Sequence, residues 1–408
     1  AAISPQKCID CGECIRVCPY KAKKATHDRL DSLKNYKYKI ALPAPALYGQ
    51  FDNLDDIDFV VQGLYDMGFD DVFEVAKAAE MVSGYTRQYL RSENIPKPVI
   101  SSACPVIVRL ISMRFPLLCK NILPILPPVE VAGKFAREKA LREHPELSDS
   151  DIGCFFISPC PAKVSYVKNS FSGTKSNVDA VLSVSDVYFE LVSAMNKIKV
   201  PEKSTEAGCV GVSWATAGGE STAVFNERYL AADGIENVIR VLDQIENSDF
   251  PELEFVELNA CNGGCVGGVM TVANPYIAKA RIHSLRRYLP VSPNYHPSDG
   301  EMDGGVVMPD VESIPQTPLS DDRAEAVRMM SDIQEIRKDL PDLDCGSCGA
   351  PTCAAFAEDI VRGEASADDC VVFMRHVFHD YIKRHVQQSR IAEEKTADGE
   401  NERRKADT

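Results

Sequence analysis

The sequence has no long uninterrupted apolar run, and its 408 residues include a single tryptophan. The most apolar stretch, residues 98–133, is broken by Arg109, Arg114, Lys120 and several prolines. A membrane-spanning helix needs about 20 consecutive apolar residues. Positive charge is also scarce: the sequence has 45 Lys and Arg against 60 Asp and Glu, which gives a formal net charge of −15. The sequence therefore predicts no membrane span.

The acidic balance argues against two kinds of partner. Nucleic acids are bound largely by neutralising their phosphates with Lys and Arg, and anionic membrane surfaces attract basic segments. We expect neither nucleic acid nor a membrane as a partner. Residues 1–5, AAISP, show no apolar segment of a secretory signal. We therefore expect a reducing, cytoplasmic location.

Cysteine, in contrast, is abundant, with 15 residues. Disulfides and metal sites both use many cysteines, but in a reducing compartment clustered spacings favour metals. A chain of this length can form one large core with small appended modules. Cys119, Cys154 and Cys209 fall in none of the motifs below, and we expect them to be buried free thiols.

Near the N-terminus the run Cys8-x2-Cys11-x2-Cys14-x3-Cys18 is followed by Pro19. This spacing is that of bacterial ferredoxins and predicts a 4Fe–4S cubane. Structural zinc usually takes two short cysteine pairs separated by a longer loop, which this segment lacks. No second run is present. Either Cys18 closes the cluster or a distant cysteine does, and we expect Cys18.

A second cysteine group, near the C-terminus, has the spacing Cys345-x2-Cys348-x4-Cys353 with Cys370 downstream. It resembles a four-cysteine cubane domain of corrinoid iron–sulfur proteins and electron-transfer membrane complexes. Its glycines permit a tight wrap around a cluster. Zinc remains the alternative on spacing alone.

Between these groups, apolar strand-like and helix-like segments alternate, which is typical of α/β folds. Short apolar runs at 99–101, 154–158 and 254–258 each lead directly into a cysteine motif, and α/β proteins usually bind ligands at the carboxyl ends of strands. We expect strands at 38–42 and 71–76, helices at 54–67 and 78–91, and a helix capped at 185–186 that runs to about residue 198.

The three cysteine motifs are SSACP at 101–105, SPCPAK at 158–163 and ELNACNGGC at 257–265. An iron–sulfur cubane needs four thiolates, which these segments supply. Taken together over residues 38–290, the motifs resemble the three signature motifs of the iron-only ([FeFe]) hydrogenases. In that family they hold the H-cluster, a cubane joined through one cysteine to a diiron unit with CO, CN and a bridging dithiolate.

The resemblance implies a role for each matching residue. Lys163 would donate a hydrogen bond to a cyanide of the diiron unit, and Cys265 would bridge that unit to the cubane. These two residues are the catalytic candidates. The cubane ligands would be Cys104, Cys160, Cys261 and Cys265, and the residues lining the diiron site would be Ala44, Pro45, Ala103, Ser158, Lys163, Trp214 and Asn259.

Several positions depart from the family pattern. Active members carry a proton-relaying cysteine where this chain has Ala103, and methionines where it has Ser158 and Asn259. A glutamate of the proton route is replaced by Tyr166, and the helix that supplies further carboxylates retains only Glu80. Acid–base transfer by a placed side chain is typically worth about 10²–10⁴-fold in rate. The resemblance therefore implies slow turnover, as in sensory branches that lack the relay cysteine.

The resemblance also implies the domain organisation. We expect a two-lobed α/β H-cluster domain with mixed sheets flanked by helices, and small iron–sulfur modules at both ends. The expected ranges are 1–32 for the ferredoxin-like module, 36–290 for the H-cluster domain, 291–335 for a linker, 336–382 for the C-terminal module and 383–408 for a polar helical or disordered tail.

The expected function is reversible oxidation of dihydrogen, used mainly as a dihydrogen or redox sensor with electrons passing through the flanking clusters. Its partners would be dihydrogen, protons, a ferredoxin-like or signalling redox protein, and hydrogenase maturation proteins. One alternative is a fully active ferredoxin-linked hydrogenase with a different proton path. Another is a non-enzymatic hydrogenase-like iron–sulfur assembly protein, against which Lys163 and the apolar segment at 44–46 argue.

Overall fold

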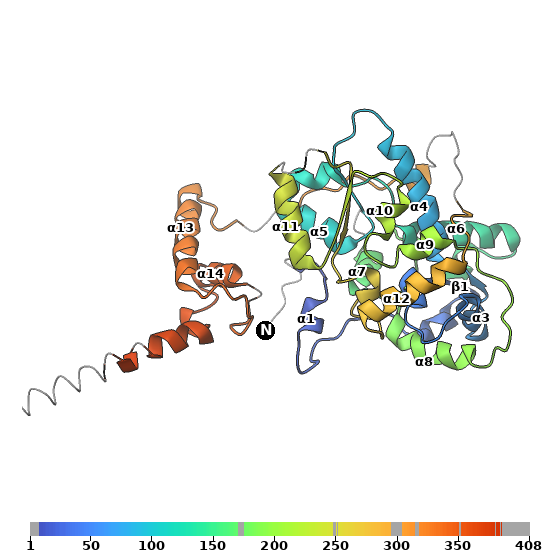
Figure 1. Ribbon diagram of the computed structural model, residues 1–408, viewed down its shortest axis with the longest axis horizontal. Helices are drawn as coiled ribbons and strands as arrows, with labels where there is room; N and C mark the ends of the chain where they lie inside the picture. Colours follow the sequence, from blue (N-terminus) through green and yellow to red (C-terminus); the bar gives the residue numbers. More distant parts are fainter. Residues whose placement is uncertain are drawn as a thin grey trace, which may run out of the picture. The chain divides into compact units, whose positions relative to one another are not determined.

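The computed structural model describes residues 8–169, 175–247, 250, 252–294, 304–314, 318–350, 352–379, 381–383 and 385. The chain divides into a large unit within residues 4–315 and a small unit within residues 316–408 (Figure 1). No helix in the described part of the chain is both long enough and apolar enough to cross a membrane.

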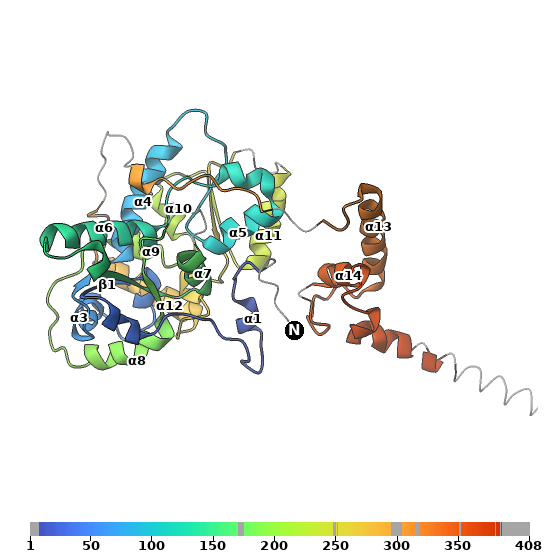
Figure 2. The same cartoon turned by 180° about the vertical axis from the view of Figure 1, so that it is seen from behind.

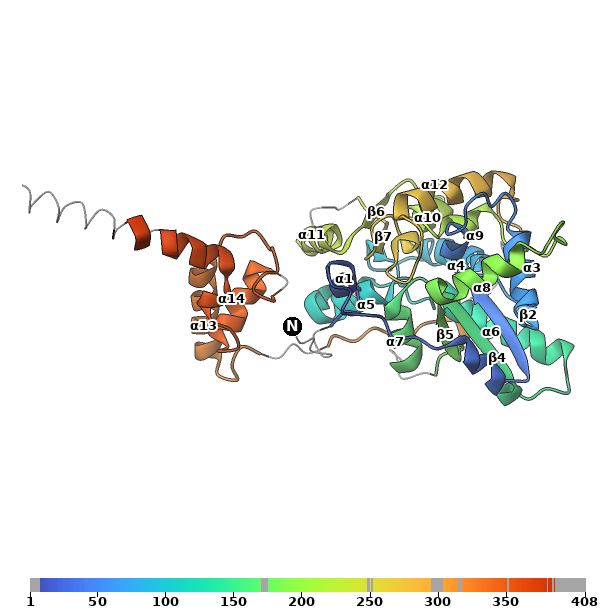
Figure 3. The same ribbon diagram turned by 90° about the horizontal axis from the view of Figure 1, so that it is seen from below.

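Two sheets of parallel strands form the centre of the large unit (Figure 3). The first has the order β2-β1-β4-β5 and the second the order β3-β7-β6. Both sheets are parallel throughout, whereas mixed sheets were expected. The strands are β1 (Tyr38–Pro43), β2 (Asp71–Val72), β3 (Val99–Ile100), β4 (Ile152–Ser158), β5 (Ala180–Ser183), β6 (Tyr229–Asp233) and β7 (Phe255–Asn259).

Helices cover both faces of the first sheet, because alternate residues of its strands point to opposite faces. Ile40 and Phe156 pack in the apolar cluster that includes residues of α4 and α6. Ala41 and Phe155 pack in another, with residues of α3, α8 and α12. Such burial on both faces is typical of parallel sheets. In the second sheet, Val256 packs with residues of α5 and α11, which lie side by side in Figures 1 and 2.

The helices of the large unit mostly follow a strand and lead to the next one. They are α1 (Glu13–Arg16), α2 (Pro45–Tyr48), α3 (Asp58–Asp66), α4 (Val75–Leu90), α5 (Pro105–Arg114), α6 (Pro128–Glu143), α7 (Pro161–Asn169), α8 (Val184–Met195), α9 (Cys209–Ser213), α10 (Gly219–Ala223), α11 (Ile235–Glu246) and α12 (Pro275–Leu285). Short 3-10 helices include η1 (Leu30–Asn35), η2 (Pro116–Asn121), η4 (Cys265–Gly267) and η5 (Arg286–Tyr288).

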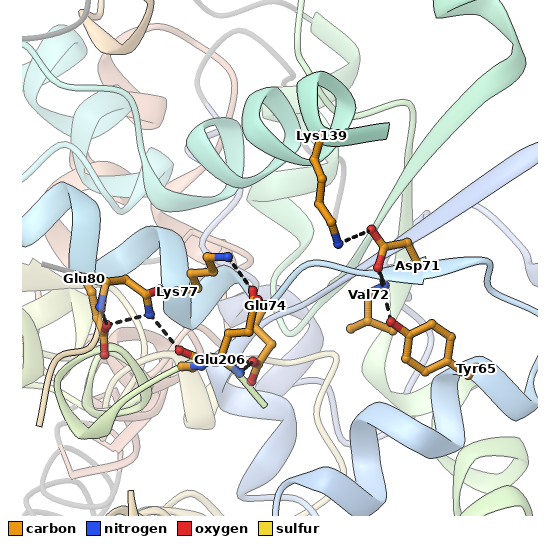
Figure 4. A network of polar contacts seen from close by, with 10 residues as sticks. Tyr65, Asp71, Val72, Glu74, Lys77, Glu80, Lys139 and Glu206 are labelled. Carbon is orange, nitrogen blue, oxygen red and sulfur yellow. Dashed lines mark hydrogen bonds and ion pairs between the residues drawn. The ribbon is translucent and has the colours of Figure 1, made fainter. Parts of the chain in front are cut away.

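The strand expected at 71–76 is wrong beyond Val72, because α4 begins at Val75. Between them, the buried carboxylate of Glu74 accepts hydrogen bonds from Tyr48 Oη (2.8 Å) and from the backbone N–H groups of Glu206 (2.7 Å) and Ala207 (3.1 Å). These bonds draw the chain out of the sheet. Figure 4 shows Glu74 and Glu206 close together, and also the ion pair between Lys139 and Asp71.

Other expected helix limits also shift. The helix expected at 54–67 begins only at Asp58, whose N–H is accepted by the side chain of Asp56. The cap expected at 185–186 is Ser183, whose hydroxyl accepts the N–H of Ser185. That helix ends at Met195 rather than at residue 198.

The linker expected over 291–335 is partly structured. Val306 is fully buried, and its carbonyl accepts the N–H of Leu126 at 2.8 Å. The N–H of Ile314 likewise donates to the carbonyl of Ser112 at 2.8 Å. Residues 304–314 therefore belong to the large unit, because apolar burial and backbone hydrogen bonds hold them there despite their Pro- and Gly-rich composition.

The small unit contains α13 (Arg323–Asp339) and α14 (Cys353–Val361), so its first helix begins inside the range expected to be a linker. The two helices share an apolar cluster centred on Phe356, Ala357 and Leu340. Helical residues follow at 371–379 and 381–383. The expected tail lies outside the described residues from 386 onward.

Candidate metal centre

Four cysteines of the large unit lie just beyond the carboxyl ends of three strands. Cys104 follows β3 and immediately precedes α5, and Cys160 follows β4 and immediately precedes α7. Proline is the first residue of both helices, a position that suits its fixed φ angle. Cys261 and Cys265 follow β7, and Cys265 begins η4. All three sequence motifs are therefore on strand-end loops, as predicted.

The four thiols are close enough to influence one another. The surrounding protein, followed by the charge of Cys104, raises the pKa of Cys160 to about 11 and that of Cys265 to about 12. By surface area, Cys160 is partly exposed and Cys265 is exposed. Burial and the charges of Cys160, Cys104 and Cys265 hold the pKa of Cys261 well above its usual value. A bound cation would offset this mutual repulsion, because metals bind cysteine as the thiolate.

The number and kind of these donors suit an iron–sulfur cluster. Four thiolates, one for each iron at the corners of the cluster, are what a 4Fe–4S cubane takes from a protein. The donor set therefore fits a cubane.

Lys163 lies beside the four cysteines, in the first turn of α7. Its Nζ donates to the carbonyl oxygen of Ala103 at 2.9 Å and lies 5.4 Å from the centroid of the Tyr166 ring. Burial lowers the pKa of Lys163, against the opposing effect of Cys104, Cys160 and Cys265. The structure thus brings together Lys163, Ala103 and the ligand candidates.

The loop that carries Cys261 and Cys265 is held against the glycine-rich stretch that follows Trp214. The N–H of Ala217 donates to the carbonyl of Gly263 at 3.1 Å, and that of Val266 to the carbonyl of Ala215 at 3.0 Å. Gly264 has φ +92°, and a Cβ there would lie 2.4 Å from the nitrogen of Ala217. Only glycine allows this close approach.

The remaining predicted lining residues occupy the neighbouring strand ends. Ala44 lies between β1 and α2, and its N–H donates to the carbonyl of Ile157 at 3.3 Å; Pro45 begins α2 and is buried. Ser158 is fully buried, and its hydroxyl accepts the N–H of Cys160 at 3.1 Å. Asn259 ends β7.

Trp214 is joined to α4 by a hydrogen bond from its Nε1 to Ser83 Oγ, 3.1 Å away. Glu80 of the same helix accepts the N–H of Gly208 (2.7 Å) and of Gly211 (3.3 Å), and the side-chain amide of Asn294 (2.8 Å). This carboxylate, the one expected to survive from a proton route, therefore holds the chain that leads to Trp214; Glu80 itself is labelled in Figure 4.

A pair of buried carboxylates lies at this centre: Glu257, which begins the third sequence motif, and Glu220. Glu220 is 4% exposed and accepts Ser101 Oγ at 2.8 and 2.7 Å. Glu257 is 3% exposed and accepts the N–H of Ser221 at 2.8 Å and Asn259 Nδ2 at 2.8 Å. Glu220 was missed because nothing local to its sequence marks it.

The two carboxylates act on each other and on the cysteines. Burial, and then the negative charge of Glu257, hold the pKa of Glu220 well above its usual value. The charge of Lys163 acts in the opposite direction on Glu220, and the charge of Glu257 contributes to the raised pKa of Cys265.

Three of the four cysteines near the N-terminus also lie close together. Burial raises the pKa of Cys11, with smaller contributions that include the charges of Cys8 and Cys14, so these three thiols lie near one another. Cys18 makes different contacts: its sulfur accepts the N–H of Ala22 at 3.4 Å, and such backbone bonds lower its pKa. The choice of Cys18 as fourth ligand stays a prediction.

In the small unit, all four predicted cysteines line one pocket, together with Gly346 and Phe356. The N–H of Phe373 donates to Cys370 Sγ at 3.4 Å. The three unassigned cysteines are free thiols as expected, but only Cys154 is buried, while Cys119 and Cys209 are partly exposed. The four ligand candidates of the pocket are Cys345, Cys348, Cys353 and Cys370.

Comparisons with known protein families agree with this organisation. The model of the iron only hydrogenase large subunit, C-terminal domain, matches residues 37–226 and 214–269, together more than half of the chain. A 4Fe-4S binding domain model matches residues 1–22, and the FeS model of an Fe-S cluster domain matches residues 340–372.

Two curated proteins give partial matches. Iron hydrogenase 1 from Clostridium pasteurianum is 24% identical over 310 residues, which cover 60% of this chain and 52% of that protein. The large subunit of the corrinoid/iron-sulfur protein from Moorella thermoacetica is 56% identical over 36 residues, 9% of this chain and 8% of its own length. The chain thus spans about half of the first relative and a small part of the second.

Solved structures show the same fold. The [FeFe]-hydrogenase HydA1 from Chlamydomonas reinhardtii, solved as a variant, has a TM-score of 0.50 at 15% identity, covering 68% of this chain and 94% of that chain. HydA(deltaEFG), from work on stepwise H-cluster assembly, has a TM-score of 0.50 at 16% identity with the same coverage.

Proposed function

The chain belongs to the iron only hydrogenase large subunit, C-terminal domain family, and on this premise we propose that it is a slow [FeFe]-hydrogenase acting as a sensor of dihydrogen or redox state. It interconverts dihydrogen with two protons and two electrons, and passes electrons through the flanking 4Fe–4S clusters. The observation that carries the proposal is the gathering of four thiols from three strand ends around Lys163.

In this proposal Cys104, Cys160, Cys261 and Cys265 would hold the cubane of the H-cluster, and Cys265 would also be shared with the diiron unit. The raised pKa of three of these thiols supports the assignment, because bringing them together favours a metal that stabilises thiolates. When bound, the group supplies the metal chemistry that splits dihydrogen. Ala44, Pro45, Ser158, Trp214 and Asn259 border the site.

The chain's own residues set the charge and the proton supply. The ammonium of Lys163 provides a buried donor for an anionic ligand, and its bond to the Ala103 carbonyl fixes its direction. The methyl side chain of Ala103 carries no proton. A missing relay typically costs about 10²–10⁴-fold in rate, and slow turnover suits a sensor. The C-terminal cysteine module supports an output of electrons to a signalling or ferredoxin-like partner.

A second candidate is a fully active hydrogenase with another proton path. It is favoured by one observation: Glu220 and Glu257 are buried beside the centre, and Ser101 joins Glu220 to the backbone N–H of Ala103. In this reading Glu220 holds a proton within reach of the ligand loops. Glu257 lies on the strand that leads to Cys261 and Cys265.

Two measurements on the matured protein test the proposal. Infrared bands of metal-bound CO and CN should be present, and their absence would identify a non-enzymatic iron–sulfur protein. Steady-state dihydrogen turnover should then be far below that of a fast hydrogenase. Fast turnover together with those bands would support the second candidate and dismiss the sensor.

A further inference from the structure

The N-terminal module is docked directly on the loop of the central ligands. Arg16 at the end of α1 donates from Nη2 to the carbonyl oxygen of Gly267 at 3.0 Å, although 251 positions separate them in the sequence. Gly267 ends η4, the 3-10 helix that begins at Cys265. Gly12 has φ +78°, and a Cβ there would lie 2.8 Å from Val269 Cγ2, so glycine is needed for this approach.

Apolar packing continues this contact toward the cysteines. Ile9 and Cys11 of the N-terminal module pack against the same apolar cluster as Cys104 and Cys160. The two sets of thiols are thus joined through one continuous body of packed side chains. A charged side chain that lies between the N-terminal module and the central cysteines can therefore act electrostatically on both sets of thiols.

Arg16 is such a charge. Its Nε lies 3.4 Å from Glu13 Oε1, and its side chain is 29% exposed. Its Nη2 is held 3.0 Å from the carbonyl oxygen of Gly267, two residues after Cys265, so the positive charge lies against the loop of the central ligands. Arg16 therefore favours added negative charge at the central cysteines, while its hydrogen bond to Gly267 fixes its place.

We propose that Arg16 is a positioning residue that fastens the N-terminal module to the Cys265 loop and favours one-electron reduction of the central cubane. The inference rests on the proposed assignment of Cys104, Cys160, Cys261 and Cys265 as its ligands. Reduction adds one electron, and so one negative charge, to the cubane. A fixed positive charge nearby makes that step more favourable, and the attraction is larger inside protein than in water.

The test uses the full chain, loaded with iron and sulfide but without the diiron unit, and titrated with dithionite while its electron paramagnetic resonance is followed. The central signal is identified as the one lost in Cys261→Ala. We expect Arg16→Gln to lower the reduced-to-oxidised ratio of that cubane at least tenfold at a fixed potential, a shift of about 59 mV for one electron. Arg16→Lys, which retains the charge, should stay close to the unmodified protein.

Exposed Lys24 of the same module provides the matched control, because Lys24→Gln removes one positive charge away from this contact. If the central cubane has the same reduction potential in Arg16→Gln as in Lys24→Gln, the inference is wrong. Equal shifts in Arg16→Lys and Arg16→Gln would overturn the role of charge. If no signal is lost in Cys261→Ala, the ligand assignment itself is wrong, and both the proposed function and this inference fail.

Discussion

Lys163 Nζ and the carbonyl oxygen of Ala103 are hydrogen-bonded at 2.9 Å. The partly buried amine of Lys163 is therefore fastened to the backbone at the position where the resemblance implies a proton-relaying cysteine. The acceptor is the main-chain oxygen of Ala103, so the side chain at position 103 can be changed without removing the hydrogen-bond partner of Lys163.

We expect Ala103→Cys to raise dihydrogen turnover by less than about tenfold, since a restored thiol supplies one proton carrier out of several in a relay. Burial raises the pKa of Tyr166, so this residue remains a poor replacement for a carboxylate. The rate of dihydrogen evolution from a reduced viologen dye measures the effect. Ala103→Ser is the control of similar size, and a gain of about a thousandfold from the thiol alone would show that the outer path is intact.

Cys265→Ala should abolish the infrared bands of CO and CN, because the bridge to the diiron unit is lost. The signal of the N-terminal cluster should persist in the same sample, since Cys8, Cys11 and Cys14 belong to another part of the fold. Cys209→Ala removes a cysteine outside the four ligand candidates and should leave the bands unchanged. Normal bands in Cys265→Ala would contradict the bridging role.

Glu220 should make the free energy of unfolding depend on pH. Burial and the charge of Glu257 raise its pKa in the folded state, whereas the unfolded chain titrates near about 4.3. The folded state therefore holds the additional proton, and stability falls as pH rises above that value, by at most about 1.4 kcal/mol per pH unit for this group.

The free energy of unfolding is measured by urea titration at several pH values from about 5 to 8. This range lies above the pKa of Glu in the unfolded chain, where the stability is expected to fall. Glu220→Gln has no proton to lose, so its midpoint should fall less steeply than that of the unmodified chain. Glu252→Gln, at an exposed position, should keep the original slope. Parallel curves for the unmodified chain and Glu220→Gln would refute the raised pKa.

Iron analysis of the reconstituted chain without its diiron unit should approach about twelve irons, at about four for each of three cubanes. Cys353→Ala should lose about four of these while the infrared bands of the matured protein stay. Its cysteine lines the pocket of the small unit with three others. If the unmodified protein instead contains about eight irons together with bound zinc, and Cys353→Ala loses the zinc, the C-terminal group is a zinc site.

The parts of the fold that could be predicted are those written in local sequence. An apolar run, a cysteine and then proline predict a strand end, a ligand and a helix start, and β4, Cys160 and Pro161 have that arrangement. The three motifs could thus be assigned to the ends of strands. The order of the strands and the division into two sheets depend on long-range packing.

The missed features arise from contacts between distant residues. Glu220 gains its importance from Ser101, 119 positions away, and from Glu257. Val306 is buried within a segment whose composition indicates a linker, because it packs against a core that the segment itself does not reveal. In both cases the tertiary structure, and not local propensity, decides the outcome.

The central ligands come from the ends of three strands in two separate sheets, and this has a consequence for biosynthesis. A growing chain cannot present all four thiols until Cys265, after β7, has emerged from the ribosome and joined the others, so the central set of ligands is completed only after residue 265 has been made. Cys8, Cys11 and Cys14 lie close together in the sequence and emerge early. The N-terminal set of cysteines is therefore available for iron before the central set exists, and the synthesis of most of the large unit lies between the two.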